Sequence, residues 1–135
     1  MIDHLQLRPR GQGLHEFTRQ LADCVARADL SEGLCTVFIR HTSCGLVIQE
    51  NADPSARRDL ERWFSRLVPE RDPLYTHTAE GDDDMPAHIK AALTASSLSI
   101  PIVGGRLALG TWQGVYLWEH RDRGGSRNLV VHIRA

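Results

Sequence analysis

The sequence is poor in the features that mark membrane, secreted and nucleic-acid-binding proteins. No hydrophobic run approaches the roughly 20 residues of a membrane-spanning helix, and the first residues lack the basic head and apolar stretch of a signal peptide. The formal net charge of the 135 residues is −1, which gives no electrostatic basis for binding nucleic acid or a membrane surface. We therefore expect a cytoplasmic protein that binds neither.

Cysteine is also scarce. The three cysteines, Cys24, Cys35 and Cys44, are odd in number and have no Cys-x-x-Cys spacing, which favours reduced thiols over a disulfide framework. Cys24 lies in a helical pattern and Cys35 in an apolar run, so both are expected in the core. Cys44 directly follows the run His41–Ser43, and a catalytic thiol is the alternative interpretation of that position.

Lysine is almost missing, because Lys90 is the only one among 16 basic residues. A genome that favours arginine codons explains this without any function. The alternative is that position 90 needs a compact ammonium group that a guanidinium cannot replace.

Hydrophobic spacing predicts helices and strands in mixed order. Helices are expected over residues 14–28, from the cap and first turn Asp53-Pro54 to Pro69, and from residue 85 or 86 to Thr94. The expected strands cover residues 4–8, 34–39, 46–48, 98–103, 106–109, 114–120 and 128–133. Without a βαβ rhythm, this order predicts an α+β fold with antiparallel pairing in a single domain, residues 1–135.

Three histidines in polar, turn-forming sequence are the strongest candidates for chemistry. His41, His77 and His88 would make a metal site with an open position if they converge. Zinc suits three imidazoles best, although nickel, iron or manganese fit when carboxylates complete the shell. Their separations follow no local motif, however, and each histidine taken alone is better explained as a hydrogen-bonded structural residue.

Carboxylates occur near two of these positions. The cluster Glu80, Asp82, Asp83 and Asp84 precedes His88 and predicts either capping of the helix start, or a carboxylate metal ligand or an acceptor that orients a metal-bound histidine. Glu50 and Asp53 are alternative carboxylates, of which Asp53 already has a capping role. Lys90 follows His88 by two residues, so on a regular helix their side chains point about 200° apart and serve different surfaces.

The last third of the chain offers candidate groups for a phosphorylated ring. Arg121 and Arg127 flank the turn Gly124-Gly125-Ser126, where two guanidinium groups and free amides could hold a phosphate. An ordinary solvated hairpin is the alternative. Trp112 stands beside Gln113 between two glycines, where it could stack on a ring or anchor two sheets.

Several motifs together resemble one family. The run Ser97–Ile102, the glycines before Arg106, and Gly110-Thr111-Trp112-Gln113-Gly114 are similar to the signature of the YjbQ-like proteins, which are often described as secondary thiamine-phosphate synthases. Further matches are His41-Thr42-Ser43, Glu50-Asn51-x-Asp53-Pro54, Val68-Pro69, His77, Glu80-Gly81, Met85-Pro86-x-His88-Ile89-Lys90, Glu119-His120-Arg121 and Gly124–Arg127. Cys44, where the family usually has alanine, and Ala95, where it often has glycine, depart from the pattern.

The resemblance implies a fold, an assembly and a reaction. The implied fold is an antiparallel β-sandwich carrying two or three helices, assembled as a homotrimer, with a metal on His41, His77 and His88. The implied reaction joins hydroxymethylpyrimidine diphosphate to thiazole phosphate and releases pyrophosphate. A metal-dependent hydrolase and a non-catalytic trimer that binds a metal or phosphorylated metabolite are the alternatives.

The matched motifs also supply expected roles for individual side chains. We expect the catalytic residues to be Glu50, Asp53 and Lys90. We expect the substrate to contact Ser43, Asn51, Trp112, Gln113, Glu119, Arg121 and Arg127.

Overall fold

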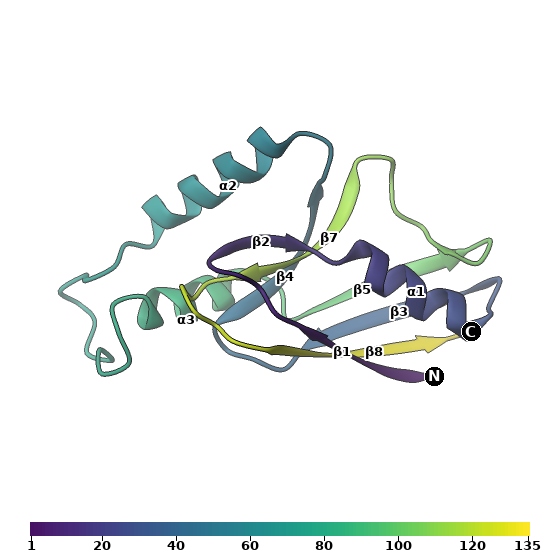
Figure 1. Ribbon diagram of the computed structural model, residues 1–135, viewed down its shortest axis with the longest axis horizontal. Coiled ribbons are helices and arrows are strands. Elements are labelled where there is room, and N and C mark those ends of the chain that lie inside the picture. The colour runs from purple at the N-terminus through teal and green to yellow at the C-terminus, as the bar shows by residue number, and fades with distance from the viewer.

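The computed structural model describes residues 1–135 and has three helices on two curled antiparallel sheets (Figure 1). Five strands form one sheet in the order β1 (Ile2–Leu7), β8 (Arg127–Arg134), β3 (Glu32–Ile39), β5 (Ser97–Val103) and β6 (Arg106–Leu107). The second sheet has the order β2 (Gly13–Glu16), β7 (Gln113–Glu119) and β4 (Cys44–Glu50). The helices are α1 (Thr18–Ala28), α2 (Pro54–Leu67) and α3 (Asp84–Leu93). This architecture confirms the predicted α+β fold.

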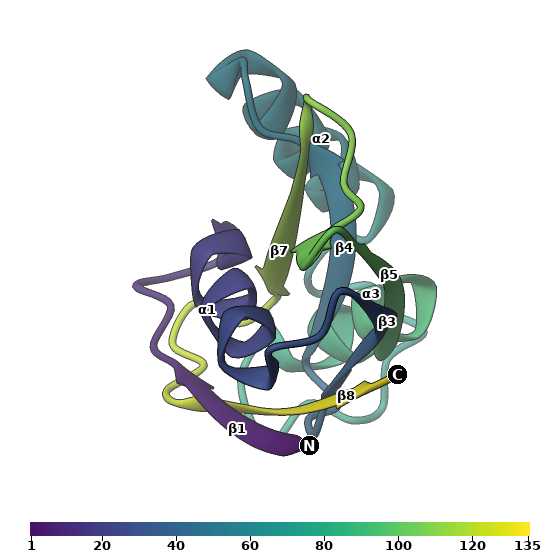
Figure 2. The same cartoon turned by 90° about the vertical axis from the view of Figure 1, so that its right-hand side faces the viewer.

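The main core lies between the two sheets, and α1 packs into it. Figure 2 shows α1 flanked by β7 on one side and by β1 and β8 on the other. Phe17, Leu21 and Cys24 at or near α1 are at most 1% exposed and join residues of both sheets in one cluster of 16 buried side chains. On β8, buried and exposed residues alternate, as expected for a strand with one face on the core.

A smaller cluster attaches α2 to the other face of the three-stranded sheet. Phe64 and Val68 from this part of the chain pack on Leu14, Tyr116 and Trp118. The central strand β7 is therefore covered on both faces, which explains why its residues from Gly114 onward are buried without alternation.

The start of α1 differs from the prediction. The sequence pattern placed residues 14–28 in one helix, but Gly13–Glu16 form β2, which pairs with β7, and α1 begins at Thr18. Leu14 and Phe17 are both buried in the observed structure, so helical spacing of apolar residues did not distinguish the two arrangements. The strand predicted over residues 106–109 is also shorter, ending at Leu107.

The start of α2 agrees with the prediction. The side chain of Asp53 accepts a hydrogen bond from the amide of Ser55 at 2.9 Å, and Pro54 is the first helical residue. None of the three helices is both long and apolar enough to cross a lipid bilayer.

Candidate metal centre

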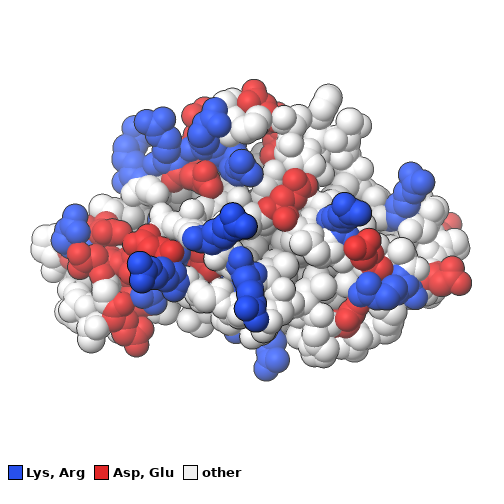
Figure 3. Space-filling view, in the orientation of Figure 1, with Lys and Arg blue, Asp and Glu red and all other residues white.

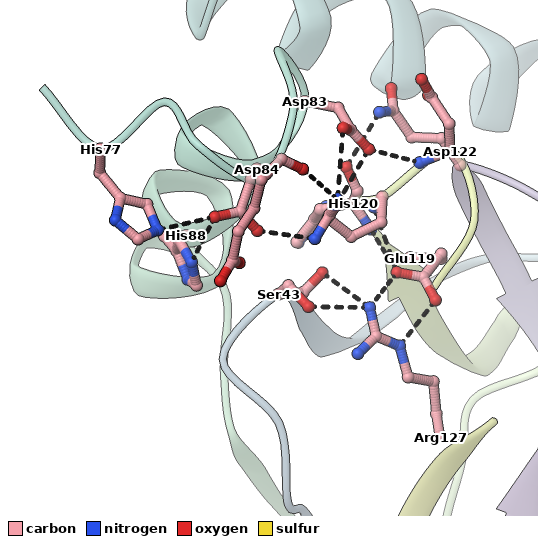
Figure 4. Close-up of polar contacts among 12 residues, drawn as sticks. Ser43, His77, Asp83, Asp84, His88, Glu119, His120, Asp122 and Arg127 are labelled. Atoms are coloured by element: carbon pink, nitrogen blue, oxygen red, sulfur yellow. Dashed lines mark hydrogen bonds and ion pairs between the residues drawn. The ribbon is translucent and has the colours of Figure 1, made fainter. Parts of the chain in front are cut away.

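Two histidines and one aspartate converge at the start of α3. Asp84 is in the first turn of this helix, His88 lies one turn further on, and His77 comes from the preceding loop. One ligand atom from each residue lies within 4.8 Å of the others. The Nε2 atoms of His77 and His88 are 2.8 and 3.1 Å from the same carboxylate oxygen, Oδ2 of Asp84 (Figure 4).

The orientation of the His88 ring is fixed by the backbone. Its Nδ1 is 2.9 Å from the carbonyl oxygen of Thr42, which can only accept a hydrogen bond, so Nδ1 carries the hydrogen and donates it. A neutral imidazole then has a lone pair on Nε2, yet this atom faces the Asp84 carboxylate. Two lone pairs that face each other repel. A second proton or a metal ion between Nε2 and the carboxylate turns this repulsion into an attraction.

Arg121 binds the carboxylate oxygen of Asp84 that the histidines do not contact. Its Nη1 donates to Oδ1 of Asp84 at 2.7 Å, while its Nε donates to Asp83 at 3.0 Å and its Nη2 to the carbonyl oxygen of Glu80 at 3.0 Å. Partial burial raises the pKa of Asp83, but hydrogen bonds from the Asp122 amide and Arg121 outweigh this effect and keep it below the ordinary value. Asp83 and Asp84 are therefore held by Arg121 in one network, of which Asp84 is the buried carboxylate.

The arrangement is suited to holding a divalent cation. It offers two imidazole nitrogens and one carboxylate oxygen, a donor set found in catalytic zinc sites that keep one position open. Asp84 is 2% exposed, whereas the side chains of His77 and His88 are 51% and 31% exposed, so the cluster is accessible from the histidine side.

Within one chain, His41 is not part of this cluster. Its Nε2 accepts a hydrogen bond from the amide of Asn128 at 2.8 Å, which occupies that lone pair. Burial, followed by the nearby charge of Arg127, lowers the pKa of His41. The structure thus brings together two of the three predicted histidines, and the third group at this point is Asp84.

Arg127, Glu119 and Ser43 form a buried network and not an open phosphate site. Arg127 and Glu119 are 4% and 0% exposed, and Nε of Arg127 donates to Glu119 at 2.7 Å. Nη2 of Arg127 donates to the Ser43 hydroxyl at 2.9 Å. The substrate contacts predicted for these three residues do not fit this arrangement, because their polar atoms already satisfy one another. Arg121 is likewise occupied by the carboxylates described above.

The other predicted catalytic carboxylates lie at the far end of β4. Thr42, which contacts His88, precedes this strand, whereas Glu50 is the last residue of the strand, about 20 Å from its first residue at 3.3 Å per residue. Asp53 caps α2, and the hydrogen bonds from Ser55 lower its pKa. One oxygen of Glu50 is buried without a hydrogen-bond partner.

The predicted ring-binding residues lie at the same distant end. Trp112 is 64% exposed, and the side chain of Gln113 accepts a hydrogen bond from the Gly110 amide at 2.7 Å. Asn51 donates to Glu16 at 3.1 Å. A single chain therefore does not place these residues beside the histidine cluster.

The side chain of Lys90 points away from the cluster of His77, Asp84 and His88, as the helical spacing predicted. It is 4% exposed, and its Nζ lies 5.7 Å from the centre of the Phe64 ring. Burial lowers the pKa of Lys90, although the charges of Glu70 and Asp122 act in the opposite direction. His88, two residues earlier, points instead to the Thr42 carbonyl.

Cys44 does not have the environment of a catalytic thiol. All three cysteines are free and buried, in agreement with the prediction of reduced thiols. Burial raises the pKa of Cys44 to about 12, so the thiolate that nucleophilic chemistry requires is strongly disfavoured at neutral pH.

Asp84 is the member of the acidic cluster that contacts both histidines. The sequence leaves capping and metal ligation open for all four acidic residues, and the structure brings Asp84 together with His77 and His88. The spacing Asp84-x-x-x-His88 carried a usable signal, since residues four apart lie on the same helix face.

Comparisons with known proteins place the chain in a family. The family model described as "UPF0047 protein YjbQ-like" matches residues 3–135. The UPF0047 protein sll1880 of Synechocystis is 54% identical over 96% of this chain and 88% of its own length, and YjbQ of Escherichia coli O157:H7 is 42% identical over 96% and 94%. The crystal structure of the conserved hypothetical protein TT1486 from Thermus thermophilus is 33% identical, covers 98% of this chain and 99% of its own, and superimposes with a TM-score of 0.87. The chain belongs to the UPF0047 family of YjbQ-like proteins.

Proposed function

We propose that this protein is a divalent-metal-dependent enzyme whose metal is held by His77, Asp84 and His88. The observation that carries the proposal is the double contact of the His88 ring. Its Nδ1 is fixed by the Thr42 carbonyl and its Nε2 is directed at Asp84, so the lone pair of Nε2 and the carboxylate face one point. Zinc is the expected ion, since two imidazoles and a carboxylate are ligands that it accepts readily.

The residues around the cluster would prepare it for a metal ion. The Thr42 carbonyl selects the tautomer of His88 that leaves Nε2 free, and Arg121 fixes the orientation of Asp84. A bound divalent ion would supply Lewis acidity for an oxygen-rich group of a substrate. The exposed edge of His77 leaves room for that substrate on the solvent side.

The reaction we propose is the one that the family resemblance implies. A nitrogen of thiazole phosphate attacks the methylene carbon of hydroxymethylpyrimidine diphosphate, a C–N bond forms, and the C–O bond to pyrophosphate breaks. Charge on the departing pyrophosphate must be stabilised, and that is a task a divalent ion performs. The substrate class is thus a phosphorylated heterocycle.

We also propose that the protein works as a homotrimer in the cytoplasm. An apolar groove of about 500 Å³ runs between α2, α3 and β4, and 11 of its 12 lining residues are hydrophobic. Trp63, Leu67 and Leu93 in this groove are 54%, 52% and 61% exposed, and a contiguous exposed apolar surface favours association. The three reduced cysteines agree with a reducing compartment.

The decisive experiment is an assay of thiamine phosphate formation with metal-loaded wild type and the variant His88→Ala. The proposal expects activity that disappears in the variant. Equal rates in both proteins would reject the synthase reaction at this site. Metal binding without formation of thiamine phosphate would favour the hydrolase or the non-catalytic binding protein. Hydrolysis of phosphatase substrates would then indicate the hydrolase, and no hydrolysis the binding protein. Light scattering during gel filtration measures the oligomeric state, with a trimer expected and a monomer contradicting it.

A further inference from the structure

A polar pocket lies along the face of α3 that carries Lys90, opposite the face that carries His88. It has a volume of about 400 Å³ and is formed by the end of α2, the residues that follow it and the buried side of α3. That volume falls within the range of sites for small ligands. Its lining residues are Gln12, Ser65, Val68, Pro69, Glu70, Arg71, Asp83, Pro86 and Lys90.

Lys90 is the unpaired charge of this pocket. It is 4% exposed and makes neither a hydrogen bond nor an ion pair with any other residue of the chain, and its Nζ lies 5.7 Å from the centre of the Phe64 ring. Because Lys90 lines the pocket and its ammonium has no acceptor within the chain, only solvent or a ligand in the pocket can accept its hydrogen bonds. An oxygen-rich group in the pocket would supply the missing acceptors.

The carboxylates of the pocket are already neutralised by other residues. Glu70 contacts Nη1 of Arg71 at 3.6 Å. Asp83 accepts hydrogen bonds from Nε of Arg121 at 3.0 Å and from the amide of Asp122 at 2.9 Å. The charges of Glu70 and Asp122 also act on Lys90, but neither carboxylate forms an ion pair with it, so an anion entering the pocket can contact the ammonium directly.

Further donors surround the same space. Arg71 uses only Nη1 in its ion pairs with Glu70 and Asp82, so its remaining N–H groups are free. Ser65 adds a hydroxyl on the last turns of α2. Figure 3 shows basic and acidic side chains intermixed on one face of the molecule, so the specificity of the pocket would come from these local donors and not from a broad field.

Arg71 also lies between this pocket and a cavity beside His77, one of the proposed metal ligands. It lines a second cavity of about 220 Å³ that contains His77, Gly81 and Asp82. A ligand can therefore contact Arg71 from either side. The arginines that the sequence suggested for phosphate, Arg121 and Arg127, are by contrast occupied by carboxylates.

From these observations we infer that this polar pocket binds a phosphate group against Lys90, with Arg71 and Ser65 as further donors. The inference rests on the proposed function for its substrate class, a phosphorylated compound, and it names the cation that meets the phosphate. The phosphate can belong to an organic substrate or be the inorganic pyrophosphate released. Lysine binds phosphate as a point charge in many proteins.

The single lysine makes a direct test possible. Amine acetylation of the native protein reports on only two amines, Lys90 and the N-terminal amine of Met1, and peptide mass spectrometry separates them. We expect 10 mM pyrophosphate to slow acetylation of Lys90 at least fivefold and to leave Met1 unchanged. Unchanged acetylation of Lys90 would overturn the inference. Comparison of inorganic phosphate, pyrophosphate, thiamine phosphate and unphosphorylated thiamine then identifies the source of the phosphate, and protection by thiamine equal to that by thiamine phosphate would also overturn it.

Variants separate this inference from the metal site. Calorimetric binding of pyrophosphate should weaken at least tenfold in Lys90→Gln and Arg71→Gln and stay unchanged in Arg19→Gln, an exposed arginine on α1. His88→Ala should retain protection of Lys90 while losing the metal. If the metal binds and Lys90 is not protected, only the phosphate pocket fails. If Lys90 is protected and no metal binds, the proposed function fails and the pocket stands.

Discussion

The Nδ1–H of His88 donates a hydrogen bond of 2.9 Å to the carbonyl oxygen of Thr42, 46 positions earlier in the chain. This contact joins α3 to the turn before β4 and selects the tautomer whose Nε2 can bind a metal. The neighbouring His41 makes a different contact and accepts from the Asn128 amide. The two histidines therefore have separable roles.

The first prediction concerns the identity of the metal ligands. His88→Ala removes a direct ligand, so zinc affinity should fall by more than the roughly 100-fold that loss of a supporting residue costs. His41→Ala is the matched control and should keep an affinity close to that of wild type, because His41 contacts the Asn128 amide and not the cluster. Competition with a chromophoric chelator measures both. Equal losses in the two variants would support a site that includes all three histidines.

A second prediction concerns the residue behind Asp84. Arg121→Gln should lower metal affinity by about 10- to 100-fold, because Asp84 loses the hydrogen bond that orients it. Arg123→Gln changes an exposed neighbour and should have no effect. Affinity of the Arg121 variant equal to that of wild type would show that Asp84 needs no such support.

The local features of the fold were readable from the sequence. Asp53 and Pro54 predicted the start of α2 correctly, because a cap and a proline act through adjacent backbone groups. Strand β2 was not predicted, because this short segment pairs with β7 more than a hundred residues later. The sequence around Leu14 contains no local signal of that pairing.

The candidate site was only partly readable for the same reason. The spacing of Asp84 and His88 is a local relationship on α3, and it could have been found. The contacts of His88 with Thr42 and of His77 with Asp84 depend on how a loop and two elements meet, which spacing does not specify. Burial of Arg127 against Glu119 likewise depends on β7 and β8 lying together, so the arginine could not be distinguished from an exposed one.

A third prediction concerns the buried pair of Arg127 and Glu119. Glu119→Gln leaves the Arg127 charge without a full partner in the interior, so the free energy of unfolding should fall by about 3 kcal/mol. The double variant Glu119→Gln/Arg127→Met should recover part of this loss, because it removes the unpaired charge. Urea unfolding gives both values. A loss no larger than in Asp3→Asn, which breaks the exposed pair with Arg27, would contradict the account.

The fourth prediction is a dependence of stability on pH through His120. Burial, followed by the charges of Lys90 and Arg127, lowers the pKa of His120 from 6.5 to about 3. Between these values the unfolded chain binds a proton at this residue that the folded chain does not bind. The contribution of neutral His120 to the free energy of unfolding is therefore fully present above pH 6.5 and is lost as the pH falls toward 3.

The slope of this loss is about 1.4 kcal/mol per pH unit within that window. His120→Gln should show a shallower decline in the free energy of unfolding between pH 6.5 and pH 4 than wild type does. The control His132→Gln alters an exposed histidine on β8 and should keep the slope of wild type. Identical slopes in wild type and His120→Gln would mean that His120 is protonated in the folded protein.

The central claim is that His77, Asp84 and His88 hold one divalent metal ion. An anomalous-scattering map of crystals grown with zinc tests it most directly. The account predicts a single strong peak bonded to Nε2 of both histidines and to a carboxylate oxygen of Asp84, and no peak in the variant His77→Ala/His88→Ala. A wild-type map without density between these three side chains, or with the ion bound elsewhere, would contradict it.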